Sequence, residues 1–245
     1  MKSLGIIATG IATLASVATA AVQGFDISHY QPNVDFKAAY ASGARFVIIK
    51  ACHLGIQTEL WSVTNQSQAT EGTTYRDPKF SSHYTGATNA GFIRGGYHFA
   101  RPASSSGAAQ ANFFLKHGGG WSGDGITLPG MLDMEYNPSG NACYGLSQAS
   151  MRNWINDFVN TYHGATGRYP LLYTSTSWWK TCTGNTAMFA DKCPLVIARY
   201  NSNVGELPAG WPFQTIWQYN DHYKYGGDSD SFNGGYSQLQ KIATG

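Results

Sequence analysis

The run Ile126-Thr127-Leu128-Pro129-Gly130-Met131-Leu132-Asp133-Met134-Glu135 is apolar along most of its length and closes on two carboxylates. Near-continuous apolar runs of this kind are typical of strands in parallel sheets that are covered on both faces. On a strand, side chains two positions apart point to the same face and lie about 6–7 Å apart along the chain. The run therefore predicts a buried strand that presents Asp133 and Glu135 in one shared environment.

Two carboxylates that close together have a specific chemical consequence. Like charges resist simultaneous ionisation, so the pKa of one group is expected to rise while the other group stays charged. Glycoside hydrolysis needs such a pair, because an acid protonates the leaving oxygen while a carboxylate stabilises charge at the anomeric carbon or orients a participating group. For an isolated Asp-x-Glu, a solvated turn at a strand end is the favoured interpretation, and only the surroundings of this pair favour a catalytic site.

Short apolar runs alternate with amphipathic runs along the rest of the chain. Strands are expected at 22–27, 45–51, 92–100, 126–135, 170–174, 195–200 and 215–219, and helices at 35–42, 79–90 and 107–117. The clearest helix follows Ser147, a candidate N-cap, and ends at Gly164 or Gly167; its apolar stripe is Met151, Trp154, Ile155, Phe158, Val159 and Tyr162. No Gly-x-Gly-x-x-Gly opens a helix, so the alternation favours a single TIM-like β/α barrel over a doubly wound sheet.

Polar residues follow the predicted strands at the end where such barrels carry their active sites. They are Asp26, Lys50, Tyr97 and His98, Asp133 and Glu135, Tyr173, Arg199 and Gln218. Each is compatible alone with a structural role, whereas the whole set at one rim predicts a site. Tyr97, Tyr173 and Trp217 could present flat faces to sugar rings, with core packing as the alternative for each and the favoured one for Trp217.

Composition and the amino terminus limit the class of protein. The chain has 245 residues, of which 42% are hydrophobic and 12% charged, with a formal net charge of +2. This balance predicts neither nucleic-acid binding nor an electrostatic membrane footprint. Lys2 precedes an apolar run that ends in Ala18-Thr19-Ala20, which indicates a secretory signal peptide at 1–20 and a secreted, extracellular domain at 21–245.

The cysteines and histidines predict disulfides rather than a metal centre. Secretion permits disulfides, and Cys52, Cys143, Cys182 and Cys193 allow three complete pairings. Cys-x-x-Cys, His-Glu-x-x-His and Gly-x-Ser-x-Gly spacings are absent from the sequence, and its seven histidines are scattered. We therefore expect no metal and no cofactor.

Five motifs, in order along nearly all of 21–245, resemble one family. They are Gly24-Phe25-Asp26-Ile27-Ser28-His29-Tyr30-Gln31, Phe46-Val47-Ile48-Ile49-Lys50-Ala51, Gly95-Gly96-Tyr97-His98-Phe99-Ala100, Leu132-Asp133-Met134-Glu135 and Asp228-Ser229-Asp230-Ser231-Phe232-Asn233-Gly234. Together they resemble the Chalaropsis-type lysozymes, glycoside hydrolase family 25, in their fungal branch. The resemblance implies a modified barrel whose C-terminal part lacks some helices.

The same resemblance implies an N-acetylmuramidase that cuts the β-1,4 bond between N-acetylmuramic acid and N-acetylglucosamine in bacterial peptidoglycan. It implies Glu135 as general acid, Asp133 as the carboxylate that assists the 2-acetamido group, and Asp26 and Asp228 as further acids. Asp228 is preferred to Asp230 because the first acid of Asp-x-Asp-x-Phe-Asn-Gly matches the family position.

Substrate-binding residues are expected to be Tyr97, Tyr173, Lys50, Glu71 and Arg199. We expect a monomer with peptidoglycan as its partner, and neither nucleic acid nor membrane. Two alternatives stay open, a chitin-type acetamido-sugar hydrolase and an inactive cell-wall-binding module.

The sequence departs from the family pattern at 52–69. Family members run from Lys-Ala directly into Thr-Glu-Gly-Thr-x-Tyr, whereas here eighteen residues separate Lys50-Ala51 from Thr70-Glu71. Their 54 nucleotides would suit a translated, unspliced intron, and a genuine specificity loop is the alternative. Without this segment Cys52 disappears; the family pairing then joins Cys143 to Cys182, and a Cys182–Cys193 bridge remains the competitor.

Overall fold

The computed structural model describes residues 21–51 and 72–245, and within them eight strands close into a barrel. The strands are β1 (Val22–Ile27), β2 (Phe46–Lys50), β3 (Ile93–Phe99), β4 (Met131–Asp133), β5 (Leu171–Thr174), β6 (Leu195–Ala198), β7 (Ile216–Asn220) and β8 (Asp228–Phe232). Neighbours from β1 to β7 are parallel, and β8 pairs antiparallel with both β7 and β1. The predicted single β/α barrel is confirmed.

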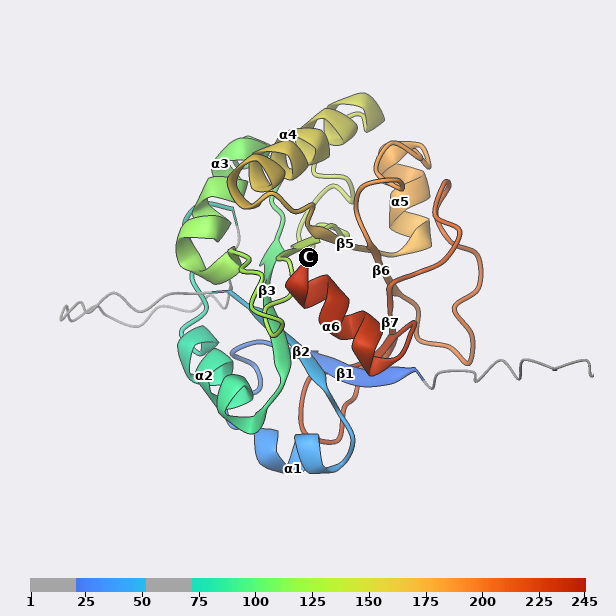
Figure 1. The fold of residues 1–245 in the computed structure, drawn as a ribbon. Coiled ribbons are helices and arrows are strands. Elements are labelled where there is room, and N and C mark those ends of the chain that lie inside the picture. Colours follow the sequence, from blue (N-terminus) through green and yellow to red (C-terminus); the bar gives the residue numbers. More distant parts are fainter. Residues whose placement is uncertain (1–20, 52–71) are drawn as a thin grey trace, which may run out of the picture.

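Helices cover the outside of the barrel (Figure 1). They are α1 (Phe36–Ala41), α2 (Phe80–Ala90), α3 (Gly107–Phe114) with a short π turn η1 (Leu115–Gly119), α4 (Gln148–Thr166), α5 (Thr176–Thr183) and α6 (Tyr236–Thr244). The fully described stretch from β6 to β8 contains no helix, which agrees with the expected loss of helices in the C-terminal part. No helix in the described ranges is long and apolar enough to cross a membrane.

Helix α4 shows how the local sequence sets an element. The Ser147 hydroxyl accepts a hydrogen bond from the Ser150 backbone N–H at 3.2 Å, which caps the first turn. Gly167 ends the helix with φ at 72°, a left-handed conformation that glycine adopts without steric cost. The buried stripe between these caps is the predicted set from Met151 to Tyr162, and it packs α4 against α3 and the barrel.

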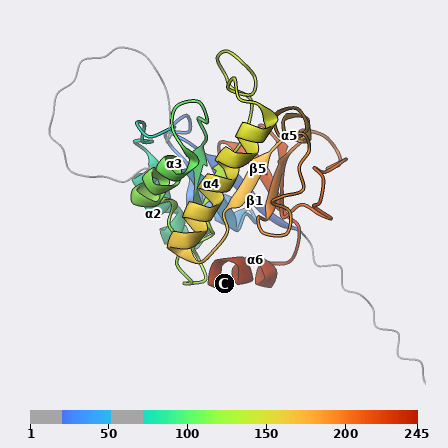
Figure 2. The same cartoon turned by 90° about the horizontal axis from the view of Figure 1, so that it is seen from above.

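The half of the barrel interior nearest the amino-terminal ends of the parallel strands is apolar. Each strand contributes one large side chain to this layer, except β2, which contributes two: Val22, Phe46 and Ile48, Ile93, Met131, Leu171, Val196, Ile216 and Phe232. Leu239 and Ala243 of α6 complete it, so α6 closes the amino-terminal end of the barrel (Figure 2). The next inward-facing positions along the strands lie toward the opposite end and are mostly polar.

Three sequence expectations need correction. Strand β8 is missing from the expected strands, because its inward residues are Asp228, Asp230 and Phe232 rather than an apolar run. It also runs antiparallel to its neighbours, whereas the other strands are parallel. Strand β4 is shorter than the predicted 126–135, since the chain makes only an isolated bridge at Thr127 before Met131. The helix expected at 107–117 changes to the π turn after Phe114.

The disulfide joins Cys143, in the loop before α4, to Cys182 in α5 with a Cα–Cα distance of 5.3 Å. This is the pairing that the family resemblance implies, and the competing Cys182–Cys193 bridge is not formed. Cys193 is a buried free thiol. Cys52, with the rest of 52–69, lies outside the described residues.

Candidate active site

The polar end of the barrel holds a cavity of about 170 Å³, which we call the acid cavity. Its lining residues are Asp26, Lys50, Tyr97, Phe99, Met131, Asp133, Glu135, Tyr173, Tyr200, Gln218 and Asp228. Every strand supplies at least one of them directly or through the residues that follow it. The structure thus brings together the four predicted acids, Lys50 and both predicted tyrosines.

Asp133 is the last residue of β4, and Glu135 lies just beyond it. The Met134 N–H still donates to the Tyr173 carbonyl at 2.9 Å, so the ladder continues one residue further and turns Glu135 toward the same cavity as Asp133. Burial raises the pKa of Glu135, while Lys50 and Arg101 partly oppose the rise. Burial, reinforced by the charge of Glu135, raises the pKa of Asp133 well above its ordinary value.

Asp133 has one further property that matters for binding. Its side chain is 6% exposed, and its Oδ1 atom has no hydrogen-bond partner among the described residues. Buried polar atoms are normally paired, because an unmet acceptor costs about 1–3 kcal/mol. Asp133 therefore presents an acceptor oxygen that a donor on a substrate can satisfy.

Asp26 and Asp228 form the opposite wall of the acid cavity. They are directly paired across β1 and β8, and Gln218 of β7 donates from Nε2 to both, at 2.7 Å to Asp26 and 3.2 Å to Asp228. Burial, together with the charge of Asp228, raises the pKa of Asp26 to about 8 despite the hydrogen bond from Gln218. Burial also raises the pKa of Asp228.

Asp230 lies one inward position deeper, opposite Gly24 of β1. It is 1% exposed, and burial, followed by the charges of Asp26 and Asp228, raises its pKa well above the ordinary value. It does not line the acid cavity, whereas Asp228 does. Of these two acids, Asp228 is therefore the one that shares a cavity with Asp133 and Glu135.

Lys50 is the only cation among the described residues that line the acid cavity. Its Nζ atom lies 5.5 Å from the ring centre of Tyr97 and 5.0 Å from that of Phe99. Burial lowers the pKa of Lys50, and the charges of Asp133 and Glu135 oppose that change. One ammonium group thus faces four carboxylic acids, so the cavity is strongly acidic in character.

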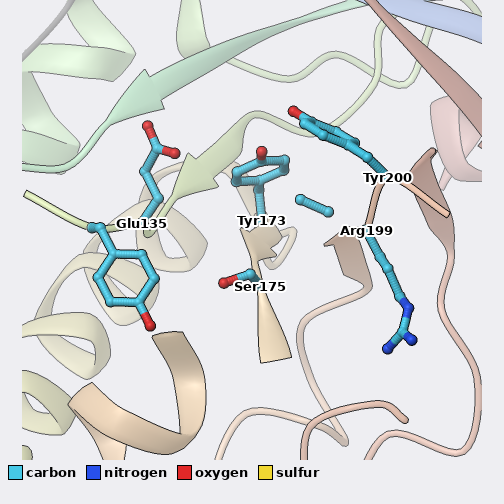
Figure 3. Close-up of a pocket in the computed structure, with 7 residues that line it drawn as sticks. Glu135, Tyr173, Ser175, Arg199 and Tyr200 are labelled. Carbon is cyan, nitrogen blue, oxygen red and sulfur yellow. The ribbon is translucent and has the colours of Figure 1, made fainter. Parts of the chain in front are cut away.

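A second cavity of about 240 Å³ adjoins Glu135, and we call it the tyrosine pocket. Glu135, Tyr136, Tyr173, Ser175, Ala198, Arg199 and Tyr200 line it (Figure 3). Tyr136 and Tyr200 are 42% and 53% exposed, so their ring faces are available to a ligand. The guanidinium of Arg199 points away from Glu135 and Tyr173 in this view, so Arg199 borders the pocket without reaching the acids (Figure 3).

Some expected residues lie elsewhere. His98 is fully buried between the barrel and the helices, where its Nε2 atom is 3.0 Å from Gln110 Oε1 and its ring stacks on Phe158. Trp217 donates from Nε1 to the Arg199 carbonyl at 2.8 Å and does not line either cavity. Glu71 lies outside the described residues, so its predicted approach to Lys50 stays a prediction.

Tyr200 lines both cavities but is not among the site residues expected from the sequence, which places it inside the strand expected at 195–200. The observed strand β6 ends two residues earlier, at Ala198. Among residues 21–51 and 72–245, no group of three or more His, Cys, Asp or Glu side chains has an arrangement that could hold a metal ion.

Comparisons with known proteins assign the family. Residues 63–228 match the family model described as glycosyl hydrolases family 25. An N,O-diacetylmuramidase from Chalaropsis sp is 57% identical over 228 residues, which cover 91% of this chain and 100% of that protein. A muramidase structure from Trichobolus zukalii is 64% identical with a TM-score of 0.83, covering 91% of this chain and 99% of that one. A family GH25 lysozyme from Aspergillus fumigatus is 57% identical with a TM-score of 0.83, covering 92% and 100%. The chain therefore belongs to glycosyl hydrolases family 25.

Proposed function

We propose that this glycoside hydrolase is a secreted muramidase that cleaves the β-1,4 bond between N-acetylmuramic acid and N-acetylglucosamine in bacterial peptidoglycan. Residues 21–245 would form its catalytic domain after removal of a signal peptide at 1–20. The proposal is supported by the acid cavity, which places Glu135 and Asp133 side by side, and by relatives that are named as muramidases and lysozymes.

Glu135 acts as the general acid in this proposal. Burial raises its pKa, which keeps a proton available at mildly acidic pH for the leaving oxygen. Glu135 also lines both the acid cavity and the tyrosine pocket, so it lies between two spaces that could each take a sugar. Cleavage would occur at the boundary between those spaces.

Asp133 assists the substrate's 2-acetamido group. Its unpaired Oδ1 is the observation that carries this assignment, because an acetamido N–H is a donor of the kind that this buried acceptor lacks. A hydrogen bond to the charged carboxylate would also favour ionisation of Asp133 once substrate is bound. The Asp26–Asp228 pair would supply one negative charge on the opposite wall, near the charge that develops at the anomeric carbon.

Sugar rings would be held by Tyr97 and Tyr173 in the acid cavity, with Lys50 contacting a polar substituent. Arg199, at the edge of the tyrosine pocket, would contact an anionic substituent further along the glycan. Glu71 is retained as a substrate-binding residue from the sequence. We propose that the enzyme acts as a monomer.

Product analysis on peptidoglycan and on chitin, with purified protein, tests the substrate. Release of fragments with N-acetylmuramic acid at the reducing end supports the proposal, whereas release of chitin oligomers alone would assign the enzyme to the chitin-type class. Lysis is expected to follow a bell-shaped pH profile, because it needs protonated Glu135 and ionised neighbours.

Glu135→Gln tests the catalytic assignment. It is expected to lower the rate by ~10²–10⁴-fold while the fold is kept, since an amide cannot donate a proton as an acid does. Glu206→Gln makes the same chemical change at an exposed residue that pairs with Lys180, and it should retain lysis. Near-native turnover of folded Glu135→Gln would contradict the assignment.

A further inference from the structure

Gln218 is only 3% exposed, and its side chain makes four hydrogen bonds inside the barrel. Its Nε2 atom donates to Asp26 and Asp228, and its Oε1 atom accepts from the hydroxyls of Tyr173 at 2.8 Å and Tyr200 at 3.0 Å. A primary amide has two N–H donors and an oxygen with two lone pairs, so the group is fully used. Ionised carboxylates can only accept, so the pairing also fixes which end of the amide faces the acids.

The amide of Gln218 donates to carboxylates whose surroundings disfavour a negative charge. Burial and the proximity of Asp228 both disfavour a negative Asp26. A hydrogen bond donated to a charged carboxylate works in the opposite direction, by stabilising the ionised form. Gln218 is the one side-chain donor to either carboxylate within the described part of the chain.

We propose that Gln218 is a positioning residue that keeps a negative charge on the Asp26–Asp228 pair and holds it on the wall of the acid cavity facing Asp133 and Glu135. Tyr173 and Tyr200 orient the amide from its other side. The inference rests on the proposed function, because it assigns Gln218 a part in muramidase catalysis. The shared anion would stabilise positive charge at the anomeric carbon in the transition state.

Other titratable groups also act on this pair and have to be considered in any pH measurement. They are Lys50 on β2, Tyr97 on β3, Asp133 and Glu135 at β4, Tyr173 on β5, Tyr200 after β6, Asp221 and His222 after β7, and Asp230 on β8. Among them Lys50 lowers the pKa of Asp26, and His222 lowers that of Asp228. Gln218→Met leaves all of these ionisable groups in the chain, although it also removes the acceptor for the Tyr173 and Tyr200 hydroxyls. Only the loss of the two donors acts directly on the carboxylates, so a shift of the acidic limb would report that loss.

Gln218→Met is the first test, because methionine has similar length but no donor. Loss of the hydrogen bonds should raise the proton affinity of the pair, so the acidic limb of the kcat/KM profile should move to higher pH by at least about one unit. At the wild-type optimum, kcat should fall at least tenfold while KM stays within about twofold. The substrate is purified peptidoglycan, and folding is checked by circular dichroism.

Gln218→Glu gives a second, differently shaped result. A protonated glutamic acid can still donate one hydrogen bond, whereas an ionised one adds a further anion to the cluster. Activity should therefore be best retained at acidic pH and should be lost earlier than in the wild type as pH rises. If Gln218→Met does not fold, this profile decides the question.

Gln110→Met is the matched control. Gln110 is another fully buried, hydrogen-bonded glutamine, but it binds His98 and the Arg101 backbone outside the acid cavity. It should lower the melting temperature without moving the acidic limb. A Gln218→Met enzyme that loses kcat but keeps the wild-type acidic limb would overturn the inference and leave a structural role only. Failure of the wild type to cleave peptidoglycan would instead refute the proposed function.

Discussion

Replacing Asp26 by asparagine separates the stability of the barrel from its chemistry. Burial and the charge of Asp228 raise the pKa of Asp26 from 3.8 to about 8 in the folded protein. In the unfolded chain the same group ionises near its ordinary value of about 4. Between these two values the folded state holds a proton that the unfolded state releases, so wild-type stability falls as pH rises from about 4 to about 8.

The size of the effect follows from the pKa difference. One pKa unit corresponds to about 1.4 kcal/mol, so about three units between pH 4 and pH 7 amount to about 4 kcal/mol. The neighbouring acids titrate together with Asp26, so about 4 kcal/mol is the upper limit of the stability difference that can be assigned to Asp26 alone. Asparagine keeps an oxygen that can accept the hydrogen bond from Gln218, and it carries no charge at any pH.

The assay is urea unfolding of wild type and Asp26→Asn from pH 4 to pH 8, followed by circular dichroism. We expect equal free energies of unfolding near pH 4 and a variant that is more stable by up to about 4 kcal/mol at pH 7, although its lysis is impaired. A stability difference that stays constant across this range would refute the electrostatic reasoning.

Asp124→Asn provides a control of opposite sign. Slight burial raises the pKa of Asp124, but hydrogen bonds from Ile126, Thr127 and Ser122 outweigh it and lower the pKa overall. Ionised Asp124 therefore stabilises the folded state above the pKa that Asp124 has in the unfolded chain, and this stabilisation is lost as pH falls. The asparagine variant should be less stable than wild type at neutral pH and should match it in acid.

Three other changes test separate parts of the structure. Replacing Cys143 and Cys182 by serine should lower the free energy of unfolding by about 4 kcal/mol in urea, because the bridge closes a loop with a sequence separation of 39 residues; an unchanged urea midpoint would contradict this. Gly107→Ala should lower the melting temperature, since its Cβ would lie 2.3 Å from the Trp154 carbonyl oxygen where α3 meets α4; a stabilised variant would show that the helices can separate freely. Deleting 52–69 should maintain or raise both stability and lysis; a large loss of lysis in the folded deletion protein would identify the segment as a functional loop.

Seven strands could be predicted because the barrel is covered by helices outside and packed inside. Both faces of strands such as β2 are buried, which produces continuous apolar runs like 46–49. Their ends were placed less well, since residues just beyond a ladder can be as apolar as those within it. Helix α5 (Thr176–Thr183) gave no clear signal because threonine, serine and tryptophan are weak helix formers, and capping by Ser175 becomes visible only in the structure.

The site was predictable as a set of acids but not as an arrangement. Asp133, Glu135, Asp26 and Asp228 are recognisable in motifs, and all four line one cavity. The role of Gln218 depends on the direction of its amide, which follows from contacts with residues on β1, β5 and β8 and after β6. Pairwise contacts over such long sequence separations leave no local pattern.

The reversed direction of β8 explains why its acid escapes the usual rule for barrels. In parallel strands the functional residues follow the carboxyl end, as Asp133 does on β4. Because β8 is antiparallel to β1, its first residue lies at the site and its last residue in the apolar layer: Asp228 pairs with Asp26, and Phe232 pairs with Val22. The carboxyl end of β8 therefore lies at the apolar end of the barrel, away from the site. The reversal also places Asp228 and Asp26 on adjacent strands within reach of one amide, so the antiparallel strand is what makes the shared anion held by Gln218 geometrically possible.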